Sequence, residues 1–183
     1  MLDPWYALLA AIVVLLIVAA LSKNRIVRAE NEVAYGLGQV HTQLQRRHDL
    51  IPNLVAAAKM HAAHELQVIE TIASAHKAAI SSTMGTAARF EAEDKLGRGL
   101  QVFQNNAMNY PDLRANSAFG KLMNELAEIE VCIQRSRLYY NDKVRLYLDL
   151  IRQIPGCWLS PGGQPIPPFF VSDSEARVAP VVQ

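Results

Sequence analysis

The sequence predicts an all-α protein, with an N-terminal transmembrane helix followed by an antiparallel up-and-down four-helix bundle whose first and fourth helices are long. Three observations predict this class. A charge-free apolar run opens the chain, apolar residues then recur three and four apart, and no segment alternates apolar and polar residues as a strand does. We divide the chain into an anchor (1–23), a helical domain (24–155) and a Pro/Gly-rich, irregular C-terminal tail (156–183).

The apolar run from Trp5 to Leu21 is long enough to cross a bilayer. Aromatic residues, which prefer the membrane interface, stand at its start, and basic residues follow its end. The positive-inside rule therefore places a short N-terminus outside and the bulk of the protein in the cytoplasm. A cleaved signal peptide is the alternative, but the chain lacks the basic region that begins such a peptide. The residues assigned to the anchor are Trp5, Tyr6, Leu16, Lys23 and Arg25.

A polar block, Gln43 to Val55, interrupts the first soluble helix without shifting the phase of its apolar stripe. We therefore expect one long helix, continuous with the anchor and kinked at Pro52, where the ring clashes with a carbonyl one turn earlier. The alternative is that Pro52 opens a new helix after a tight turn. The stripe positions are Ala34, Leu37, His41, Leu44, His48, Ile51, Val55, Ala58 and Ala62.

Three further helices are expected at 63–82, 87–109 and 111–154, each from its own apolar stripe. Proline is tolerated in the first turn of a helix, so Pro111 fits the start of the last one, and Pro155 with Gly156 ends it. The stripe positions are Leu66, Ile69, Ala73, His76 and Ile80; Phe90, Leu96, Leu100, Phe103, Ala107 and Tyr110; and Phe119, Leu122, Leu126, Ile129, Ile133, Ser136, Tyr140, Lys143, Tyr147, Leu150 and Ile154.

Composition and motifs give no reason to expect catalysis, a cofactor or nucleic-acid binding. The formal net charge of +1 lacks the basic surplus of a nucleic-acid-binding domain. Cys132 and Cys157 have no metal or redox spacing, and Cys132 is expected to be a small core residue. His61-Ala-Ala-His64-Glu65 comes nearest to a metal motif, but it is neither His-Glu-x-x-His nor its inverse. A metal-dependent factor that uses these histidines is therefore the less favoured alternative.

Blocks along nearly the whole chain carry a family resemblance. They are Asn31-Glu-Val-x-x-Tyr35, Gln43-Leu-Gln-Arg-Arg-His-Asp-Leu-Ile-Pro-Asn-Leu-Val55, His64-Glu65, Tyr110-Pro-Asp-Leu-Arg-Ala-Asn116, Tyr140-Asn-Asp-x-Val-Arg145 and the tail from Phe170 to Val181. With these blocks the sequence resembles the LemA family of bacterial membrane-anchored proteins. Tyr35, Leu148 and Ile154 depart from the family pattern, which commonly has tryptophan, asparagine and phenylalanine there.

The resemblance implies an N-terminal transmembrane helix, a short external N-terminus and an antiparallel four-helix domain in the cytoplasm, at the bacterial inner membrane. It implies no established activity. Some relatives sit in magnetosome membranes, and others are associated with HtpX-type membrane metalloproteases, so a membrane metalloprotease is one partner that the family suggests. The partner is otherwise unidentified.

We expect a non-enzymatic scaffold or adaptor that binds protein partners or itself at the membrane. The alternative is a lipid-binding or membrane-shaping protein that uses basic helix faces such as Arg135, Arg137 and Arg145. The first and fourth helices are neighbours in such a bundle, so we expect their polar groups to meet as a buried layer with His48 and Tyr140 inward. A partner-binding surface with all its charges facing water is the other interpretation. The candidate residues are Arg46, Arg47, His48, Asp49, Tyr140, Asn141 and Asp142.

Overall fold

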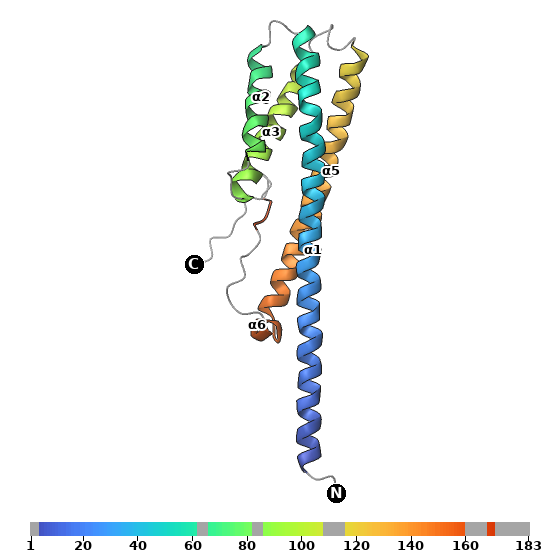
Figure 1. Ribbon diagram of the computed structural model, residues 1–183, viewed down its shortest axis with the longest axis vertical. Coiled ribbons are helices and arrows are strands. Elements are labelled where there is room, and N and C mark those ends of the chain that lie inside the picture. Colours follow the sequence, from blue (N-terminus) through green and yellow to red (C-terminus); the bar gives the residue numbers. More distant parts are fainter. Residues whose placement is uncertain (1–3, 62–65, 82–85, 108–115, 160–167, 171–183) are drawn as a thin grey trace. The chain divides into compact units, whose positions relative to one another are not determined.

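The computed structural model describes residues 4–61, 66–81, 86–107, 116–159 and 168–170. Its helices are α1 (Pro4–His61), α2 (Leu66–Ile80), α3 (Thr86–Ala107), α5 (Ser117–Arg152) and α6 (Gly156–Leu159) (Figure 1). The described ranges contain no strand, so the all-α prediction is confirmed. The chain forms two compact units: unit 1 comprises residues 1–38 and 138–183, and unit 2 comprises residues 39–137.

Helix α1 runs for 58 residues and continues through Pro52. The prediction of one continuous helix is confirmed, and the alternative of a new helix starting at Pro52 is wrong. The proline side chain is exposed. Because proline has no N–H, the backbone carbonyl of His48, one turn earlier, loses its usual helical donor.

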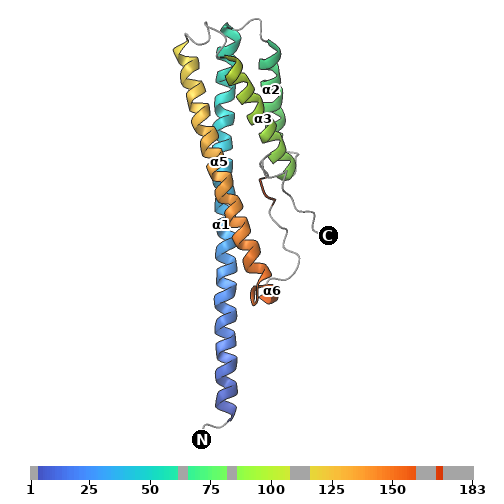
Figure 2. The same ribbon diagram turned by 180° about the vertical axis from the view of Figure 1, so that it is seen from behind.

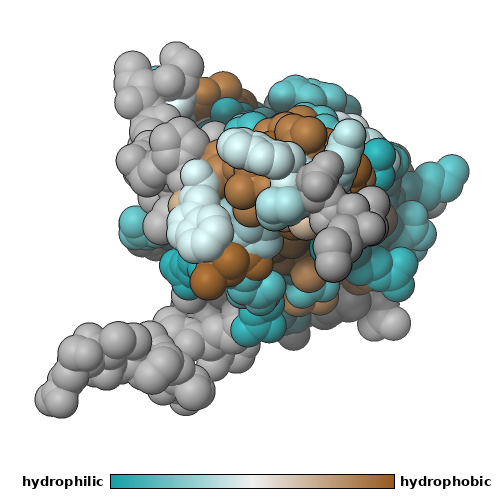
Figure 3. All heavy atoms as spheres, turned by 90° about the horizontal axis from the view of Figure 1, so that it is seen from below, coloured by the Kyte–Doolittle hydropathy of each residue, from teal (hydrophilic) through white to brown (hydrophobic). Residues whose placement is uncertain are grey.

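The N-terminal part of α1 is apolar and exposed. Within the described residues, α1 is the one helix that is long and apolar enough to cross a membrane; an 18-residue window has a mean hydropathy of 2.6, and none of that window is buried. Leu16 lies on this exposed stretch, and the exposed Lys23 and Arg25 follow it. Seen from the end at which α1 begins, apolar surface is open among hydrophilic residues (Figure 3). By length and composition, α1 is therefore a candidate membrane span.

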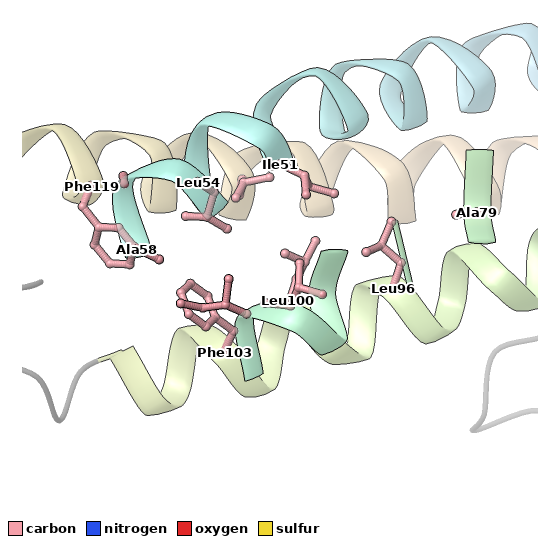
Figure 4. Close-up of a cluster of buried hydrophobic side chains, with 12 residues drawn as sticks. Ile51, Leu54, Ala58, Ala79, Leu96, Leu100, Phe103 and Phe119 are labelled. Carbon is pink, nitrogen blue, oxygen red and sulfur yellow. The ribbon is translucent and has the colours of Figure 1, made fainter. Parts of the chain in front are cut away.

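Four helices contribute to the hydrophobic core of unit 2 (Figure 4). Phe103 of α3 and Phe119 of α5 pack edge to face, with ring centroids 6.0 Å apart. Helices α2 and α3 lie side by side in both ribbon views (Figures 1 and 2). The core residues are Ile51, Leu54, Ala57 and Ala58 of α1; Ile69, Ile72 and Ala79 of α2; Leu96, Leu100 and Phe103 of α3; and Phe119 and Leu126 of α5.

Two predicted stripes need correction. On α1, Val33 and Val40 are buried and Ala34 is exposed, so the predicted stripe was centred about one residue too far round the helix. On α2, Ile80 is exposed, while Ile72 and Ala79 face the core. Both corrections are small rotations that leave the helix in place, because a 3.6-residue period leaves the stripe centre uncertain by about one residue.

The side chain of Asn116 caps the start of α5. Its Oδ1 accepts hydrogen bonds from the backbone N–H groups of Ala118 at 3.0 Å and Phe119 at 3.2 Å, as an N-cap residue does. The predicted start at Pro111 lies outside the described residues. At the other end, α5 stops at Arg152, and the short helix α6 occupies the beginning of the segment expected to be irregular.

In unit 1, α1 and α5 lie side by side in both views (Figures 1 and 2). Gly36 permits the close approach, because a Cβ atom there would be 3.2 Å from the Cα atom of Tyr140. Tyr35 is exposed, and its ring lies edge-on to that of Tyr139 at 6.4 Å. Of the positions that depart from the family pattern, Leu148 is buried and Ile154 is exposed.

A polar cluster joins the same two helices at the surface of unit 1. The Tyr139 hydroxyl donates to Glu32 Oε2 at 2.7 Å, and Lys143 Nζ lies 3.1 Å from the same oxygen. The hydrogen bond from Tyr139 and the charge of Lys143 lower the pKa of Glu32 below its ordinary value of 4.5. Because Glu32 is exposed and Lys143 and Tyr139 are only partly buried, we expect them to contribute little to stability.

Candidate functional site

Arg47 and Glu93 form a buried ion pair in unit 2. Arg47 lies on α1 and is 1% exposed; Glu93 lies on α3 and is 0% exposed. Arg47 Nη2 is 2.5 Å from Glu93 Oε2 and also donates to the backbone oxygen of Glu93 at 3.0 Å. Buried charges are costly unless they are paired and hydrogen-bonded, so this pair constrains how α1 and α3 can pack.

Two more side chains extend the pair into a network that includes α5. His48 Nε2 lies 2.8 Å from Glu93 Oε1, and it is the donor because a carboxylate only accepts. Arg47 Nη1 donates at 3.0 Å to Glu130, which is partly exposed on α5. We call Arg47, His48, Glu93 and Glu130 the buried network. Both carboxylate oxygens of Glu93 are occupied.

The protonation of Glu93 follows from two opposing effects. Burial by itself raises the pKa of this carboxyl, but the hydrogen bond from His48 and the charge of Arg47 outweigh it. The pKa of Glu93 therefore lies below its ordinary value of 4.5. The carboxylate is ionised at neutral pH, so the arginine meets a full negative charge in the core.

Gly97 makes room for the arginine on α3. A Cβ atom at this position would be 3.2 Å from Arg47 Nη1, whereas a Cβ atom at Gly99, two residues later, would meet nothing within 4 Å. The sequence offered no mechanism for either glycine. In the structure, Gly97 leaves space for the buried guanidinium of Arg47, whereas Gly99 has no neighbour that a Cβ atom would meet.

His76 of α2 lies beside the network. Its ring is 5.1 Å from that of His48, centroid to centroid, and tilted by 48°. Burial and then the neighbouring His48 ring lower the pKa of His76, while a hydrogen bond to the His48 backbone acts in the opposite direction. The partly buried environment of His76 thus favours its neutral form.

The buried network lacks the groups of a nucleophilic active site. It contains an acid and an imidazole but no hydroxyl or thiol, and Arg47 holds the Glu93 carboxylate as an ion pair rather than as a free base. His48 Nδ1 and His76 Nε2 are buried, and among the described residues neither has a hydrogen-bond partner. What the arrangement can do is connect helices: it ties α1, α3 and α5 by directional contacts.

Tyr140 and Asn141 hold residues 168–170 of the C-terminal segment in unit 1. The Tyr140 hydroxyl donates to the backbone oxygen of Pro168 at 3.1 Å. Asn141 Nδ2 donates to the Phe170 oxygen at 2.8 Å, and the Phe170 N–H donates to Asn141 Oδ1 at 3.0 Å. The Phe170 ring is buried edge-on against Tyr140 at 5.4 Å. We call this arrangement the tail clamp.

Two members of the expected polar layer, His48 and Tyr140, are each hydrogen-bonded. His48 and Tyr140 are both buried, but they belong to different units, and each finds its hydrogen-bond partner within its own unit. His48 bonds to Glu93, and Tyr140 bonds to Pro168.

The remaining candidates stay at the surface. Asp49 accepts a hydrogen bond from Gln45 at 2.8 Å, one turn back on the same helix, and Arg46 reaches only Gln43 at 3.5 Å. Asp142 is exposed. Of the four candidates in the polar block, Arg47 and His48 are buried, and Arg46 and Asp49 are exposed.

The sequence reasoning missed Glu93, although the pattern contained a signal for it. Phe90 and Leu96 were assigned to one stripe with a gap of six residues, and Glu93 lies midway at helical spacing. Arg47 fills the corresponding place between Leu44 and Ile51 on α1. Two opposite charges, each alone on an apolar stripe, are the pattern that such a pair leaves in a sequence.

Within the described residues, no three His, Cys, Asp or Glu side chains gather as metal ligands. His61 ends α1, and His64 and Glu65 of the weak metal motif lie outside those residues. Cys132 is half-buried and Cys157 is exposed, both as free thiols.

Fold and site together define a class: an all-helical protein with one long candidate membrane helix and a buried ion-pair network in its core. The sequence profile of the LemA family matches residues 36–183. The chain belongs to the LemA family. Both the buried network and the tail clamp fall within the matched range. No curated protein matches the chain.

Proposed function

We propose that this protein is a non-enzymatic scaffold anchored in the bacterial inner membrane, where it binds protein partners or itself. The N-terminal part of α1 crosses the bilayer once and leaves a short N-terminus outside. In the cytoplasm, α1, α2, α3 and α5 form an antiparallel up-and-down bundle.

The observation that carries the proposal is the continuity of α1. One helix has an exposed apolar N-terminal stretch and then contributes Ile51, Leu54 and Ala58 to a core, without an intervening loop. An exposed run of this kind is unfavourable in water and favourable in a bilayer. The same helix thus serves as anchor and as bundle element.

Support for a scaffold also comes from how the buried charges are used. Arg47, Glu93 and His48 are occupied by one another, which suits a role in fixing helix register better than a role in turnover.

The anchor is tested by placing charge in the middle of the span. Val13→Arg with Leu16→Arg should release the protein into alkaline carbonate, since arginine at the centre of a span costs about 2.5–3.5 kcal/mol on insertion scales. The matched control, Val13→Leu with Leu16→Ile, should stay in the membrane pellet as the native chain does. Extraction of the native chain by carbonate would contradict the anchor.

Orientation is tested through Cys157, which is exposed. In intact spheroplasts, a membrane-impermeant maleimide should label Cys157 only after permeabilisation, with Cys157→Ser as the background control. A cysteine at the N-terminus, Asp3→Cys in the Cys157→Ser chain, should label without permeabilisation. The reverse pattern would overturn the proposed topology.

The scaffold role is tested by photo-crosslinking in native membranes. We would place a photo-reactive amino acid at Leu138, an exposed apolar residue of α5, and at Lys121 as a polar control on the same helix. A discrete crosslinked species that forms at Leu138 and not at Lys121 would identify a partner or a second copy. Crosslinking to lipid alone would favour the lipid-binding alternative.

A further inference from the structure

We propose that α6 and the residue Ile154 before it make a second contact with the membrane, at the interface where α1 leaves the bilayer, with Trp158 among the lipid headgroups. This inference rests on the membrane anchor proposed above. It adds a binding surface for lipid that is distant in sequence from the anchor.

The position of α6 follows from one contact within unit 1. Lys23 Nζ donates to the backbone oxygen of Leu159, the last residue of α6, at 3.5 Å. Lys23 is the first charged residue after the apolar run. The contact therefore places α6 level with the end of the span, and both ribbon views show α6 beside that part of α1 (Figures 1 and 2).

Two large apolar side chains at α6 are exposed. Trp158 is 76% exposed and Ile154 is 72% exposed, so water would cover two large apolar groups a few residues apart. Trp5, at the other end of the span, is 73% exposed. Trp158 and Trp5 are the two tryptophans of the chain.

Trp5 and Lys23, the residue that contacts α6, are separated along α1 by about the thickness of the hydrocarbon core. From Trp5 to Lys23, α1 rises about 27 Å at ~1.5 Å per residue. The hydrocarbon core of a bilayer is about 30 Å thick. Trp5 thus marks one interface, and α6, held at Lys23, carries Trp158 to the other. Tryptophan is enriched at both interfaces because its ring is apolar and its N–H is polar.

The turn that carries Trp158 is tightly built. The Cys157 N–H donates to the backbone oxygen of Gln153 at 3.0 Å, and the Trp158 N–H donates to that of Pro155 at 3.1 Å. Gly156 is buried, and a Cβ atom there would collide with the Leu150 carbonyl oxygen. The backbone thus holds Trp158 outward by its own hydrogen bonds.

The local charge favours an anionic lipid surface over a protein face. Lys23, Arg25 and Arg28 follow the span, and Arg152 precedes the turn. Neither 4–29 nor 150–159 contains an acidic residue. Basic residues beside an exposed tryptophan complement the negative surface of the cytoplasmic leaflet.

Tryptophan fluorescence of the full chain tests the proposal. Trp5→Phe leaves Trp158 as the sole tryptophan, and Trp158→Phe leaves Trp5. Each variant is reconstituted in vesicles of phosphatidylcholine and phosphatidylglycerol that carry a nitroxide either near the headgroup or in the middle of the acyl chain. We expect Trp158 to be quenched at least about twofold more by the shallow than by the deep nitroxide, and to be protected from aqueous iodide, as for an interfacial ring.

Three outcomes would overturn the inference. Quenching of Trp158 by iodide without quenching by either nitroxide would show a ring in water. Protection from both quenchers would show a ring covered by protein. Deep quenching alone would show insertion below the interface. Trp5 reports separately on the anchor: if Trp5 is quenched by nitroxide lipid and Trp158 is not, the anchor stands and this inference fails.

A matched pair of variants adds a second readout. In the Trp5→Phe chain, Ile154→Glu adds charge repulsion and removes an apolar group, so quenching of Trp158 by the shallow nitroxide should fall. Ile154→Leu should leave it unchanged. Helical circular dichroism checks that both variants are folded. Equal quenching in the two variants would remove Ile154 from the proposed surface.

Discussion

Asn141 and Phe170 pair as two backbone strands would: the Asn141 amide donates to the Phe170 carbonyl at 2.8 Å and accepts from the Phe170 N–H at 3.0 Å. A primary amide can do this because it carries both a donor and an acceptor in one plane. With the Tyr140 hydroxyl donating to Pro168, side chains of α5 bind the backbone of residues 168–170, and the buried Phe170 ring packs edge-on against Tyr140.

Asn141→Asp should release the tail while the helices stay folded. Aspartate keeps the acceptor but loses the donor, and its charge faces the Phe170 carbonyl; two neutral hydrogen bonds contribute about 1–3 kcal/mol together. Hydrogen exchange of the Phe170 amide should become fast. The control is Asp142→Asn, the reverse change at an exposed neighbour, which should leave exchange slow. Slow exchange in both variants would refute the clamp.

Arg47→Met should destabilise the protein strongly, because Glu93 is left as a buried charge without its cation. Breaking a buried pair on one side typically costs about 3–5 kcal/mol. Arg47→Met combined with Glu93→Leu should recover much of this loss, since the second change removes the stranded charge. Denaturant unfolding followed by circular dichroism measures both.

The control for the Arg47→Met variants is Arg46→Met. Arg46 neighbours Arg47 in sequence and is exposed, so its loss should change the unfolding free energy by no more than about 0.5 kcal/mol. Equal effects of the two arginine variants would contradict the buried network.

Gly97→Ala and Gly99→Ala should have opposite effects on stability. Alanine favours a helix over glycine by up to about 1 kcal/mol, and at Gly99 nothing opposes this gain. At Gly97 the new Cβ atom would press on Arg47 Nη1 and disturb the pair with Glu93. The melting temperature should therefore rise for Gly99→Ala and fall for Gly97→Ala. A rise for both would show that the guanidinium has room to move.

Acidification should destabilise the fold in two steps. The folded-state pKa of His76 is below its ordinary value of 6.5, so the unfolded chain takes up this proton first, and stability falls as the pH drops below 6.5 through the folded pKa. The pKa of Glu93 is likewise lowered, so its contribution is present above 4.5 and is lost as the pH falls through its folded pKa.

The pH dependence is measured as the unfolding free energy from neutral pH downward. Each group contributes a slope of at most about 1.4 kcal/mol per pH unit. His76→Gln should flatten the first step only in part, because burial also lowers the pKa of His41, which acts in the same window. An unchanged slope in His76→Gln would contradict the lowered pKa.

Pro52→Ala should keep the fold and leave its stability equal or higher. Pro52 lies within α1 and is exposed, so alanine adds an N–H that can bond to the His48 carbonyl without entering the core. In an ideal helix interior, proline costs about 3 kcal/mol. Asn53→Ala, the exposed neighbour, controls for general helix propensity. A marked fall in the melting temperature of Pro52→Ala alone would show that the ring itself is needed.

The sequence by itself determined the helical class, the candidate span and the passage of α1 through Pro52. These are local properties: a charge-free run and a preserved three-and-four spacing can be read from neighbouring residues. Most core positions followed in the same way, such as Leu44, Ile51 and Leu100, because an apolar residue on a stripe has one face to bury.

Only the tertiary structure decided which polar groups are inside and what they touch. Arg47 was assigned to the edge of a layer and Glu93 to no site, although each occupies a core position of its helix. A charge is unfavourable in a core unless its counter-ion lies opposite, and that partner is 46 residues away along the chain. Asn141 with Phe170 and Lys23 with Leu159 are likewise distant in sequence, and their local sequence does not indicate either pairing.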